Sequence, residues 1–453
     1  MSKASEPAYL FEGIFGKPVH ARFDAEQRTS DGGLALLAGV DRRVGLTSAL
    51  AACVGDRREP SRVAHSVEDL LRQRVYSIAL GYPDANDAAQ LARDPALLMA
   101  LERRCGVDGL ASQPTLSRFE HGVQARDLVA MQRRLEDVAI ARLRKRHRCA
   151  RRIFIDLDPS VDPTHGQQPF AFFNGHYDTW CYLPMLGFLS VEGDAEQHLF
   201  HARLRAGLAK EVKGTLPLLT RTVESLRRTF PKARICIRLD AGFAHPKLFD
   251  LLDDLRVEYV VAVPTNAKLV RLCEAHMAAA DSLAATFDAT ATLFGDGRYR
   301  ARSWQRARRV VFKAEVVVAA GKTSRRNDRY VVTNLRGSAE SVWRLYCQRG
   351  DSENRIKELK NDLAIDRTSC TRFLPNALRV LMTAAAYVLF QELRATLAGT
   401  ELRRAMVATL RLRLLKIGAT VTESVRRIVI SMPSSFPWKD LWRRAAKGVA
   451  RMA

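Results

Sequence analysis

"RIFIDLD", residues 152–158, is the stretch on which the fold prediction rests. It reads as an apolar β-strand that ends in carboxylates. Asp156 and Asp158 lie two residues apart, so both side chains leave the same face of the strand. Asp158 comes at the end of the strand, where side chains open onto the edge of an α/β sheet that carries chemistry. The stretch therefore predicts a sheet with a polar, reactive edge.

More strands and helices follow in a regular order. Residues 182–191 and 198–207 are predicted as strands and 215–230 as a helix. Beyond them the chain alternates strand, helix and strand, at 233–242, 245–256 and 257–264. Three consecutive strands followed by alternating helices and strands indicate an α/β fold, in which a mixed sheet carries helices on its faces.

The flanking segments have other patterns. Residues 1–150 carry apolar residues at three-to-four spacing and predict helices. Residues 270–340 predict a small antiparallel β unit, and helices are expected again from residue 341. Cations concentrate in two segments: 298–336 holds twelve Lys and Arg against two acids, and 401–453 holds twelve against three.

The overall charge narrows the choice of partners. Lys and Arg outnumber Asp and Glu by 72 to 49, a formal net charge of +23. Such an excess is most simply explained by a polyanionic partner, with nucleic acid ahead of an anionic membrane. The longest apolar run, 380–390, falls far short of the roughly 20 residues that span a bilayer, so no membrane insertion is expected. Residues 1–18 do not read as a secretory signal.

The cysteine content indicates the redox environment and the chance of a zinc site, and the chain length indicates the number of structural units. The eight cysteines are scattered, without a Cys-x-x-Cys motif and without a His pair at zinc spacing. They predict free thiols in a reducing cytosol and no zinc site. A length of 453 residues predicts two to four structural units.

A second strand-end acid follows the first. In "RICIRLDAGFA" the residues Ile235, Ile237 and Leu239 alternate inward, and Asp240 ends the run. Acids at the ends of neighbouring strands can share a hard cation, because Mg²⁺ prefers carboxylate oxygens. The alternative is that each Asp merely caps a turn. Two such acids in a strongly basic chain favour the metal site.

A helical stretch, "YCQRGDSENRIKELK" at 346–360, contains a third acid of interest. At about 100° per residue, five side chains fall within a stripe of roughly 80°: Tyr346, Arg349, Glu353, Lys357 and Lys360. Glu353 is the acid on this cationic stripe, since Asp351, Glu358 and Asp362 point away from it. The stripe is typical of a helix on which one acid binds a metal ion and the flanking cations bind phosphates. The alternative is a solvated face joined by i,i+4 ion pairs such as Glu353–Lys357.

These residues resemble a known signature. Tyr346, Arg349, Glu353 and Lys360 have the spacing of the Tyr-Arg-Glu-Lys signature of DDE transposases encoded by bacterial insertion sequences. The stretches "DLDPSVDPTHGQQ", "FNGHY", "RLDAGFAHPKLFD", "LASQPTLSRFE" and "LPNALRVLMTAAAY" resemble the thirteen-eighty family of these transposases more closely still. The resemblance spans roughly residues 110–390, with the motifs in collinear order.

The resemblance implies a chemistry for the acids. Asp158, Asp240 and Glu353 match the three catalytic acids, with Asp156 as the alternative first acid. Two Mg²⁺ ions, or Mn²⁺ in their place, are expected at these acids for phosphoryl transfer on DNA.

It also implies which residues contact DNA. Those expected at the transposon end are Tyr346, Arg349 and Lys360 of the signature. Lys357, which lies on the same stripe of the helix, is expected to contact DNA as well. Trp304 is a candidate for stacking on a flipped base, although its residue type favours the alternative of packing inside the β-rich segment.

The implied architecture is an RNase H-like core interrupted by a β insertion. The expected parts are 1–150, a helical N-terminal region that binds transposon ends; 151–268, the first part of the core; 269–338, a basic β-rich insertion; 339–395, the Glu-bearing helix and the helix after it; and 396–453, a basic helical region for DNA or dimer contacts.

The predicted function is cut-and-paste DNA transposition, with metal-dependent cleavage at insertion-sequence ends and strand transfer into target DNA. The expected partners are the terminal inverted repeats, the target DNA and a second copy of the chain, because two ends must be held together. The expected location is the bacterial cytoplasm, on the nucleoid when DNA is bound. The alternatives are a stand-alone RNase H-like nuclease or resolvase, and a DNA-binding remnant without catalysis.

Overall fold

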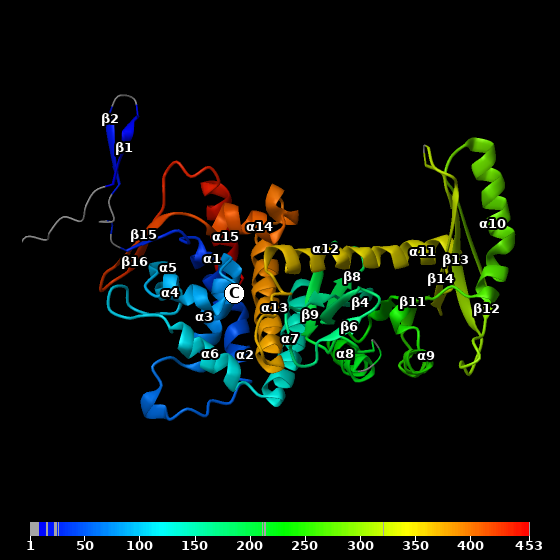
Figure 1. Cartoon of the computed structure of the whole chain (residues 1–453), viewed down its shortest axis with the longest axis horizontal. Coiled ribbons are helices and arrows are strands. Elements are labelled where there is room, and N and C mark those ends of the chain that lie inside the picture. The colour runs from blue at the N-terminus through cyan, green and yellow to red at the C-terminus, as the bar shows by residue number, and fades with distance from the viewer. Residues whose placement is uncertain are drawn as a thin grey trace, which may run out of the picture. The chain divides into compact units, whose positions relative to one another are not determined.

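The computed structural model describes residues 9–14, 17–21, 25, 27–210, 212, 214–319 and 321–452 (Figure 1). Residues 1–8, part of the stretch in which no secretory signal is expected, lie outside the described residues. The chain forms two compact units, each assembled from separate segments. The first unit comprises Met1–Gly45, Arg58–Phe119 and Leu389–Ala453, and the second comprises Leu46–Arg57 and Glu120–Val388.

The second unit is built on an eight-stranded mixed sheet, which confirms the predicted α/β class. Its strands lie in the order β12-β13-β14-β11-β10-β4-β8-β9. Their bounds are β4 (Arg152–Pro159), β8 (Met185–Val191), β9 (Gln197–Arg203), β10 (Arg234–Leu239), β11 (Glu258–Val263), β12 (Ala291–Tyr299), β13 (Arg308–Val317) and β14 (Arg325–Thr333). β10 lies parallel between β4 and β11, and the other neighbours in the sheet pair antiparallel.

Helices cover both faces of this sheet. On one face, alternate strand residues such as Ile155 and Ile237 enter a large core. The helices that complete this core are α7 (Ala125–Arg146), α8 (Thr215–Thr229), α9 (Pro246–Asp254) and α10 (Ala267–Phe287). On the other face, α11 (Ala339–Cys347) packs through Trp343 in a smaller core. Because strand side chains alternate, Asp156 and Asp158 lie on the α11 face.

The predicted antiparallel β unit consists of β12, β13 and β14 and is continuous with the main sheet. β14 pairs with β11, with Val332 opposite Val261, so these strands extend the sheet at one end. A long helix, α10, precedes the three strands and runs alongside them (Figure 1). The sequence analysis missed this helix, although its buried Leu269, Cys273 and Met277 have the four-residue spacing of a helix.

After the sheet the chain is helical. α11 continues through a 3₁₀ turn, η4 (Gln348–Gly350), into α12 (Asp351–Lys357) and a π-helix, η5 (Glu358–Asp362). α13 (Phe373–Ala395) is long and apolar enough to cross a membrane, with a mean hydropathy of 1.5, but 89% of its apolar window is buried inside the protein. Burial of this kind is typical of a core helix. The remaining elements of the second unit are α2 (Leu46–Ala51), β5 (Asp162–Pro163), β6 (Phe172–Asn174), β7 (Thr179–Tyr182) and η3 (Ala241–Phe243).

The first unit is mainly helical. Its helices are α1 (Leu34–Val44), η1 (Pro60–Arg62), α3 (Val67–Leu80), η2 (Ala85–Asp87), α4 (Ala88–Leu91), α5 (Pro95–Ala100), η6 (Glu401–Arg404), α14 (Val407–Leu410), η7 (Arg411–Leu415) and α15 (Lys439–Ala450), and α6 (Gln113–Gly122) begins in it.

Short strands in the first unit correct the expectation of a helical C-terminal region and interrupt the N-terminal region, which was expected to be mostly helical. β15 (Ala419–Glu423) pairs with β16 (Ile428–Ser431) and with β3 (Arg28–Thr29). β1 (Tyr9–Ile14) and β2 (Lys17–Ala21) form a hairpin. The stretch "ATVTE" of β15 is rich in β-branched residues, which favour strands over helices.

Candidate active site at the ends of two parallel strands

Two aspartates end neighbouring strands in the same register. In the parallel pair of β4 and β10, Asp156 lies opposite Arg238. Two residues further on, Asp158 and Asp240 therefore come opposite each other, on strands spaced about 4.8 Å apart. Asp240 directly follows β10, and its Oδ1 accepts a hydrogen bond from Gly242 N at 2.9 Å. Asp240 thus also caps a turn, as the alternative proposed, while its carboxyl group stays at the strand end.

Asp156 is held in a different arrangement. Its two carboxylate oxygens accept hydrogen bonds from Nε and Nη2 of Arg238 at 2.8 and 2.7 Å, and both side chains are buried. Arg238 also donates to the backbone oxygen of Leu345 and lies over the ring of Phe154. Removing one partner of such a buried bidentate pair costs about 3–5 kcal/mol. This geometry opposes Asp156 as the alternative first acid.

The Glu-bearing segment is helical but not uniformly α-helical. The 3₁₀ turn η4 and the π-helix η5 interrupt it, so the stripe expected from 100° steps is not straight. Its first part is present: the Arg349 guanidinium lies 5.9 Å from the centre of the Tyr346 ring, and Nη2 of Arg349 lies 3.9 Å from Oε1 of Glu353. Further along, Nζ of Lys360 donates to the backbone oxygen of Val161, three residues beyond Asp158.

Arg349 joins this segment to the strand-end acids. Its Nη1 donates to Oδ2 of Asp158 at 2.9 Å, so one guanidinium reaches both Asp158 and Glu353. The side chains of Asp158 and Arg349 are each 13% exposed, whereas Glu353 is 58% exposed. Among the described residues, the three acids do not form a group with all ligand atoms within 4.8 Å of one another. The structure therefore brings them to one region, with an arginine between two of them.

The electrostatics of this region reflect the crowding of acids. Burial raises the pKa of Asp158 to about 6; Arg349 acts against this rise, and the carboxylates of Asp240 and Glu353 add to it. Burial lowers the pKa of Arg349, but the carboxylates of Asp158 and Asp240 outweigh it, so the pKa of Arg349 rises overall. Burial raises the pKa of Tyr346 as well. The three acids therefore act on one another through a partly buried environment.

The other charged residues of 346–360 are either paired in the interior or exposed to solvent. Glu358 is buried and accepts hydrogen bonds from the hydroxyl of Tyr387 at 2.8 Å and from Arg355 at 2.9 Å. Asp351 and Lys357 are exposed. Of the acids on this segment, Glu353 is the one that approaches Arg349 and, through it, Asp158.

Trp304 is placed where it cannot stack on a base. Its side chain is 6% exposed and belongs to the large core of the second unit. Its ring packs edge-on against Phe249 at 5.0 Å and against Tyr299 at 5.3 Å. The assignment of Trp304 to DNA contact is corrected: the alternative of packing holds, because an aromatic ring of this size stabilises the junction between α9 and β12 by burial.

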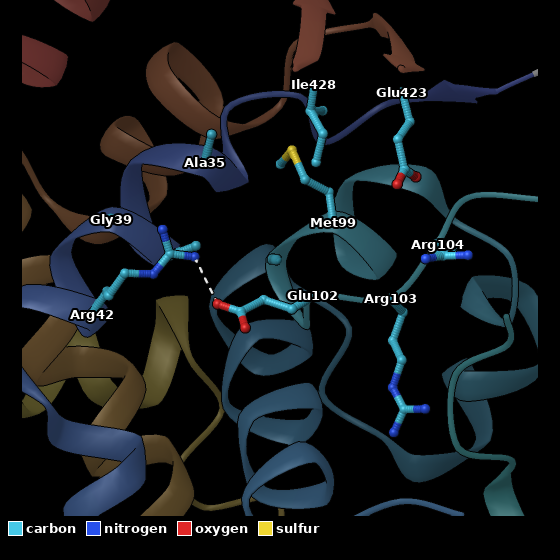
Figure 2. A pocket seen from close by; sticks show the side chains of 11 residues that line it. Ala35, Gly39, Arg42, Met99, Glu102, Arg103, Arg104, Glu423 and Ile428 are labelled. Carbon is cyan, nitrogen blue, oxygen red and sulfur yellow. Dashed lines mark hydrogen bonds and ion pairs between the residues drawn. The ribbon is translucent and has the colours of Figure 1, made fainter. Parts of the chain in front are cut away.

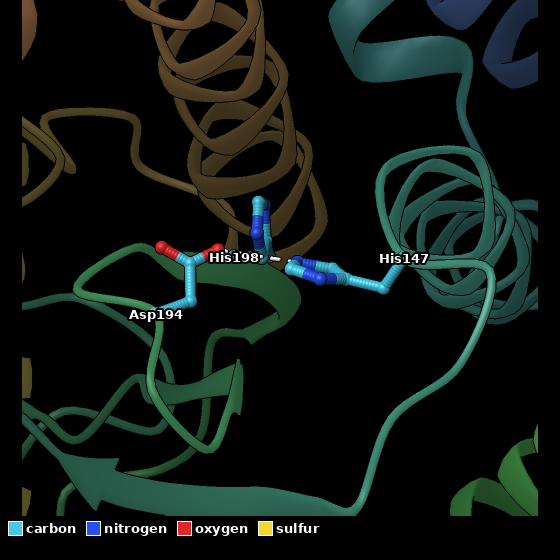
Figure 3. A group of neighbouring side chains, drawn as sticks. All are labelled: His147, Asp194 and His198. Carbon is cyan, nitrogen blue, oxygen red and sulfur yellow. Dashed lines mark ion pairs between the residues drawn. The ribbon is translucent and has the colours of Figure 1, made fainter.

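One cluster of metal-ligand side chains was missed by the sequence analysis. His147, Asp194 and His198 lie together in the second unit, with their ligand atoms all within 4.8 Å of one another (Figure 3). No local motif marks this group, because His147 is separated from the other two by more than forty residues. Asp194 and His198, four residues apart across a turn, are the pair of the three that lies close in the sequence.

The first unit contains a surface hollow of about 490 Å³ (Figure 2). Three arginines line it, but two of them are already paired with acids. Arg42 lies 3.2 Å from Glu102, and Arg103 lies 2.8 Å from Asp69. The hollow therefore offers less free positive charge than its arginines imply.

Comparison with known proteins gives the class of the chain. The profile of the family described as transposase DDE domain group 1 matches residues 11–453. The chain belongs to this family of DDE transposases, and so to the DNA-binding nucleases that carry out DNA transposition and recombination. Members of this class generally use divalent metal ions. No curated relative matches the sequence.

Proposed function

We propose that the chain is the transposase of a bacterial insertion sequence, of the Tyr-Arg-Glu-Lys branch and closest to the thirteen-eighty family. It cleaves DNA at the ends of the element and joins the freed 3′-OH to target DNA in a cut-and-paste reaction. Family membership supports transposition in general. The observation that carries the finer proposal is the in-register pair Asp158 and Asp240, reached by Arg349 from the Glu353 helix.

The strand order supports an RNase H-like core. In the sheet these strands lie in the order β9-β8-β4-β10-β11. Along the chain, β4, β8 and β9 come first and pair antiparallel. β10 and β11 follow, both parallel to β4, with α8 and α9 in the connections before them. This is the arrangement that the resemblance implies, with acids at the ends of the first and fourth strands. The segment from α10 to β14 then lies between the fifth strand and the Glu-bearing helix, as an insertion there would.

The three acids suit divalent metal ions. Their donors are carboxylate oxygens, which Mg²⁺ prefers. Burial, and after it the charges of Asp240 and Glu353, raise the pKa of Asp158 despite the nearby Arg349, so an ionised Asp158 gains from a bound cation. We assign Asp158, Asp240 and Glu353 as the residues that hold two Mg²⁺ ions, for which Mn²⁺ can substitute. When bound, the ions supply the positive charge that phosphoryl transfer needs at the attacking and leaving oxygens.

The chain's own residues align the DNA around this centre. Asp158 has to exchange its hydrogen bond to Arg349 for a metal ion, which frees the guanidinium for a phosphate of the transposon end. Tyr346, beneath Arg349, supports the guanidinium and can hydrogen-bond the same backbone. Lys360 and the exposed Lys357 extend the cationic surface along the strand that is bound. Alignment of this kind is the main catalytic task left to the protein.

The other segments are assigned by charge and position. The helical N-terminal region binds the terminal inverted repeats, and exposed cations of the β12–β14 region and of 396–453 contact DNA or the second copy of the chain. In the β12–β14 region the exposed cations include Arg298, Arg300, Arg302, Arg325 and Arg329. Synapsis of two ends requires two active sites, so a homodimer is the expected assembly. The site of action is the bacterial cytoplasm, where the element's DNA lies.

The test is cleavage of a DNA that carries the element's own ends, in Mg²⁺ or Mn²⁺. Glu353→Gln should abolish nicking and strand transfer while binding to the ends persists. Asp351→Asn is the matched control, since it removes an exposed acid from the same helix and should leave activity intact. Full activity of Glu353→Gln would remove the catalytic assignment. Nicking without strand-transfer products would favour a stand-alone nuclease, and binding without any cleavage would favour a remnant.

A further inference from the structure

His147, Asp194 and His198 converge from three different elements of the second unit. His147 is the residue at which α7 ends, Asp194 lies in the turn between β8 and β9, and His198 is on β9 (Figure 3). Nε2 of His147 lies 3.1 Å from Oδ2 of Asp194. Oδ1 of Asp194 accepts a hydrogen bond from the backbone of Glu196 at 3.0 Å, which turns Oδ2 toward the histidines.

His198 is buried and makes no hydrogen bond to the part of the chain that the structure describes. Its side chain is 1% exposed, and neither Nδ1 nor Nε2 makes a hydrogen bond to any described residue. Nε2 of His147 also lacks a hydrogen bond, despite its short distance to Asp194. A buried polar group without a partner costs about 1–3 kcal/mol, so such groups are rare unless something satisfies them. Three imidazole nitrogens without a hydrogen bond, both of His198 and Nε2 of His147, beside the Asp194 carboxylate point to a bound species.

We propose that His147, Asp194 and His198 bind a Zn²⁺ ion that holds the edge of the sheet to the end of α7. Two imidazoles and one carboxylate are a common ligand set for zinc, with water or a fourth side chain completing the tetrahedron. Ligand atoms around tetrahedral zinc lie about 3.3 Å apart at the usual bond lengths. The 3.1 Å separation of Nε2 of His147 and Oδ2 of Asp194 already meets this, and the ligand nitrogen of His198 lies within 4.8 Å of the ligand atoms of both.

The surroundings favour zinc over a hard cation. The three residues offer two imidazole nitrogens and one carboxylate oxygen as ligand atoms. A neutral imidazole is the form that binds metal. Mg²⁺ is held by oxygen ligands and does not suit a site in which two of the three ligand atoms are imidazole nitrogens. Zn²⁺ bonds well to neutral nitrogen donors.

The site is separate from the transposase acids. In the antiparallel pair of β4 and β8, Leu186 lies opposite Asp158, and Val191 lies opposite Ile153. The turn that carries Asp194 therefore follows the end of β8 farthest from Asp158. Five residues of strand separate the two ends, about 17 Å. A metal here cannot take part in phosphoryl transfer at Asp158, and its role is structural.

The effect of the ion is to fasten the edge strand of the sheet. β9 is the last strand of the sheet, and the segment 147–151 connects α7 to β4, the strand that bears the first acid. A link between His147 and His198 holds the start of β4 and the edge strand together. An ion that binds only the folded chain stabilises it by RT ln(1 + c/Kd), where c is the metal concentration, so the free energy of unfolding rises with metal concentration once that concentration exceeds the Kd.

The experiment uses the full chain without a histidine tag, purified without chelator. Metal content is measured by elemental analysis, and Zn²⁺ affinity of the stripped protein by titration. His147→Gln removes a ligand whose side chain is partly exposed, and Asp194→Asn keeps the acceptor for Glu196 while removing the charge. His176→Gln, at an exposed histidine of the same unit, is the matched control. Co²⁺ is also titrated, because its visible absorption is intense in tetrahedral sites.

We expect about one zinc per wild-type chain and a tetrahedral Co²⁺ spectrum. Each ligand variant should lose at least about ten-fold in affinity and also the rise in melting temperature on adding zinc, whereas the His176 control should retain both. An Asp158→Asn, Asp240→Asn protein should still bind zinc, which separates this site from the transposase acids. The proposal would be overturned by zinc content near zero after reconstitution or by iron in place of zinc. It would also be overturned by an octahedral Co²⁺ spectrum or by wild-type affinity in both ligand variants.

Discussion

Asp158→Asn tests how the acids are held in the absence of metal. The structure raises the pKa of this carboxyl to about 6 from its usual value of 3.8, first through burial, and its side chain is only 13% exposed. The difference of about 2.2 pH units, at 1.36 kcal/mol each, is on the order of 3 kcal/mol. That energy opposes folding whenever Asp158 is ionised, and asparagine removes it.

The effect has a defined dependence on pH. Between about pH 3.8 and 6, the folded chain keeps a proton on Asp158 that the unfolded chain has lost. The free energy of unfolding of the wild type therefore falls as pH rises through this window, and the loss is complete above the folded pKa. The variant has no such titration. The free energy of unfolding of the variant should equal that of the wild type near pH 3.5 and exceed it by on the order of 3 kcal/mol at pH 7.5.

The assay is urea unfolding of both proteins at several pH values in buffer without Mg²⁺ or Mn²⁺. Asp351→Asn, at an exposed acid, is the control and should stay within about 0.5 kcal/mol of the wild type throughout. The variant should also fail to cleave DNA and should lose the stabilisation that added Mg²⁺ gives the wild type. A variant no more stable than the wild type at pH 7.5, or a difference independent of pH, would refute the reasoning.

Three further predictions concern residues with distinct partners. Asp156→Asn should cost about 3–5 kcal/mol in the free energy of unfolding, because it leaves the Arg238 guanidinium buried without its partner charge; a loss below 1 kcal/mol would argue against a structural role. Trp304→Ala should also cost about 3–5 kcal/mol through lost packing, with DNA affinity of the folded protein unchanged; a loss of affinity without a loss of stability would restore the DNA-contact assignment. Lys360→Ala should weaken binding to the element's ends and reduce the slope of log affinity against log salt by about 0.9; an unchanged slope would show that Lys360 touches no phosphate.

Local sequence was sufficient to predict the central strands and the acids at their ends. β10 and β11 fall within the predicted segments, and β4 extends past the predicted 152–158 by Pro159 alone. Alternating or continuous apolar residues determine which backbone conformation can bury them. Asp158 and Asp240 follow from the same pattern, since a residue just past a strand must lie at the sheet edge. α10 and the short strand β15 had usable signals, helical spacing and β-branched residues, and were overlooked among more basic neighbours.

Other features depended on residues far apart in the chain. Asp156 and Asp158 are equivalent in local sequence, and only Arg238, 82 residues away from Asp156, distinguishes the buried structural acid from the one at the edge. The contact between Arg349 and Asp158 spans 191 residues. The residue type of Trp304 favours packing, but only the tertiary structure brings Phe249 and Tyr299 against it.

The amino-acid sequence by itself determined the strand periodicity, the basic charge and the spacing of the signature residues, because these depend on neighbours within a few positions. Tertiary structure alone decided which acid is paired, which tryptophan is covered, and that two histidines and an aspartate meet behind the edge strand. Burial and charge pairing are set by distance in space, and chain segments separated by 50 to 200 residues come together only when the sheet is complete.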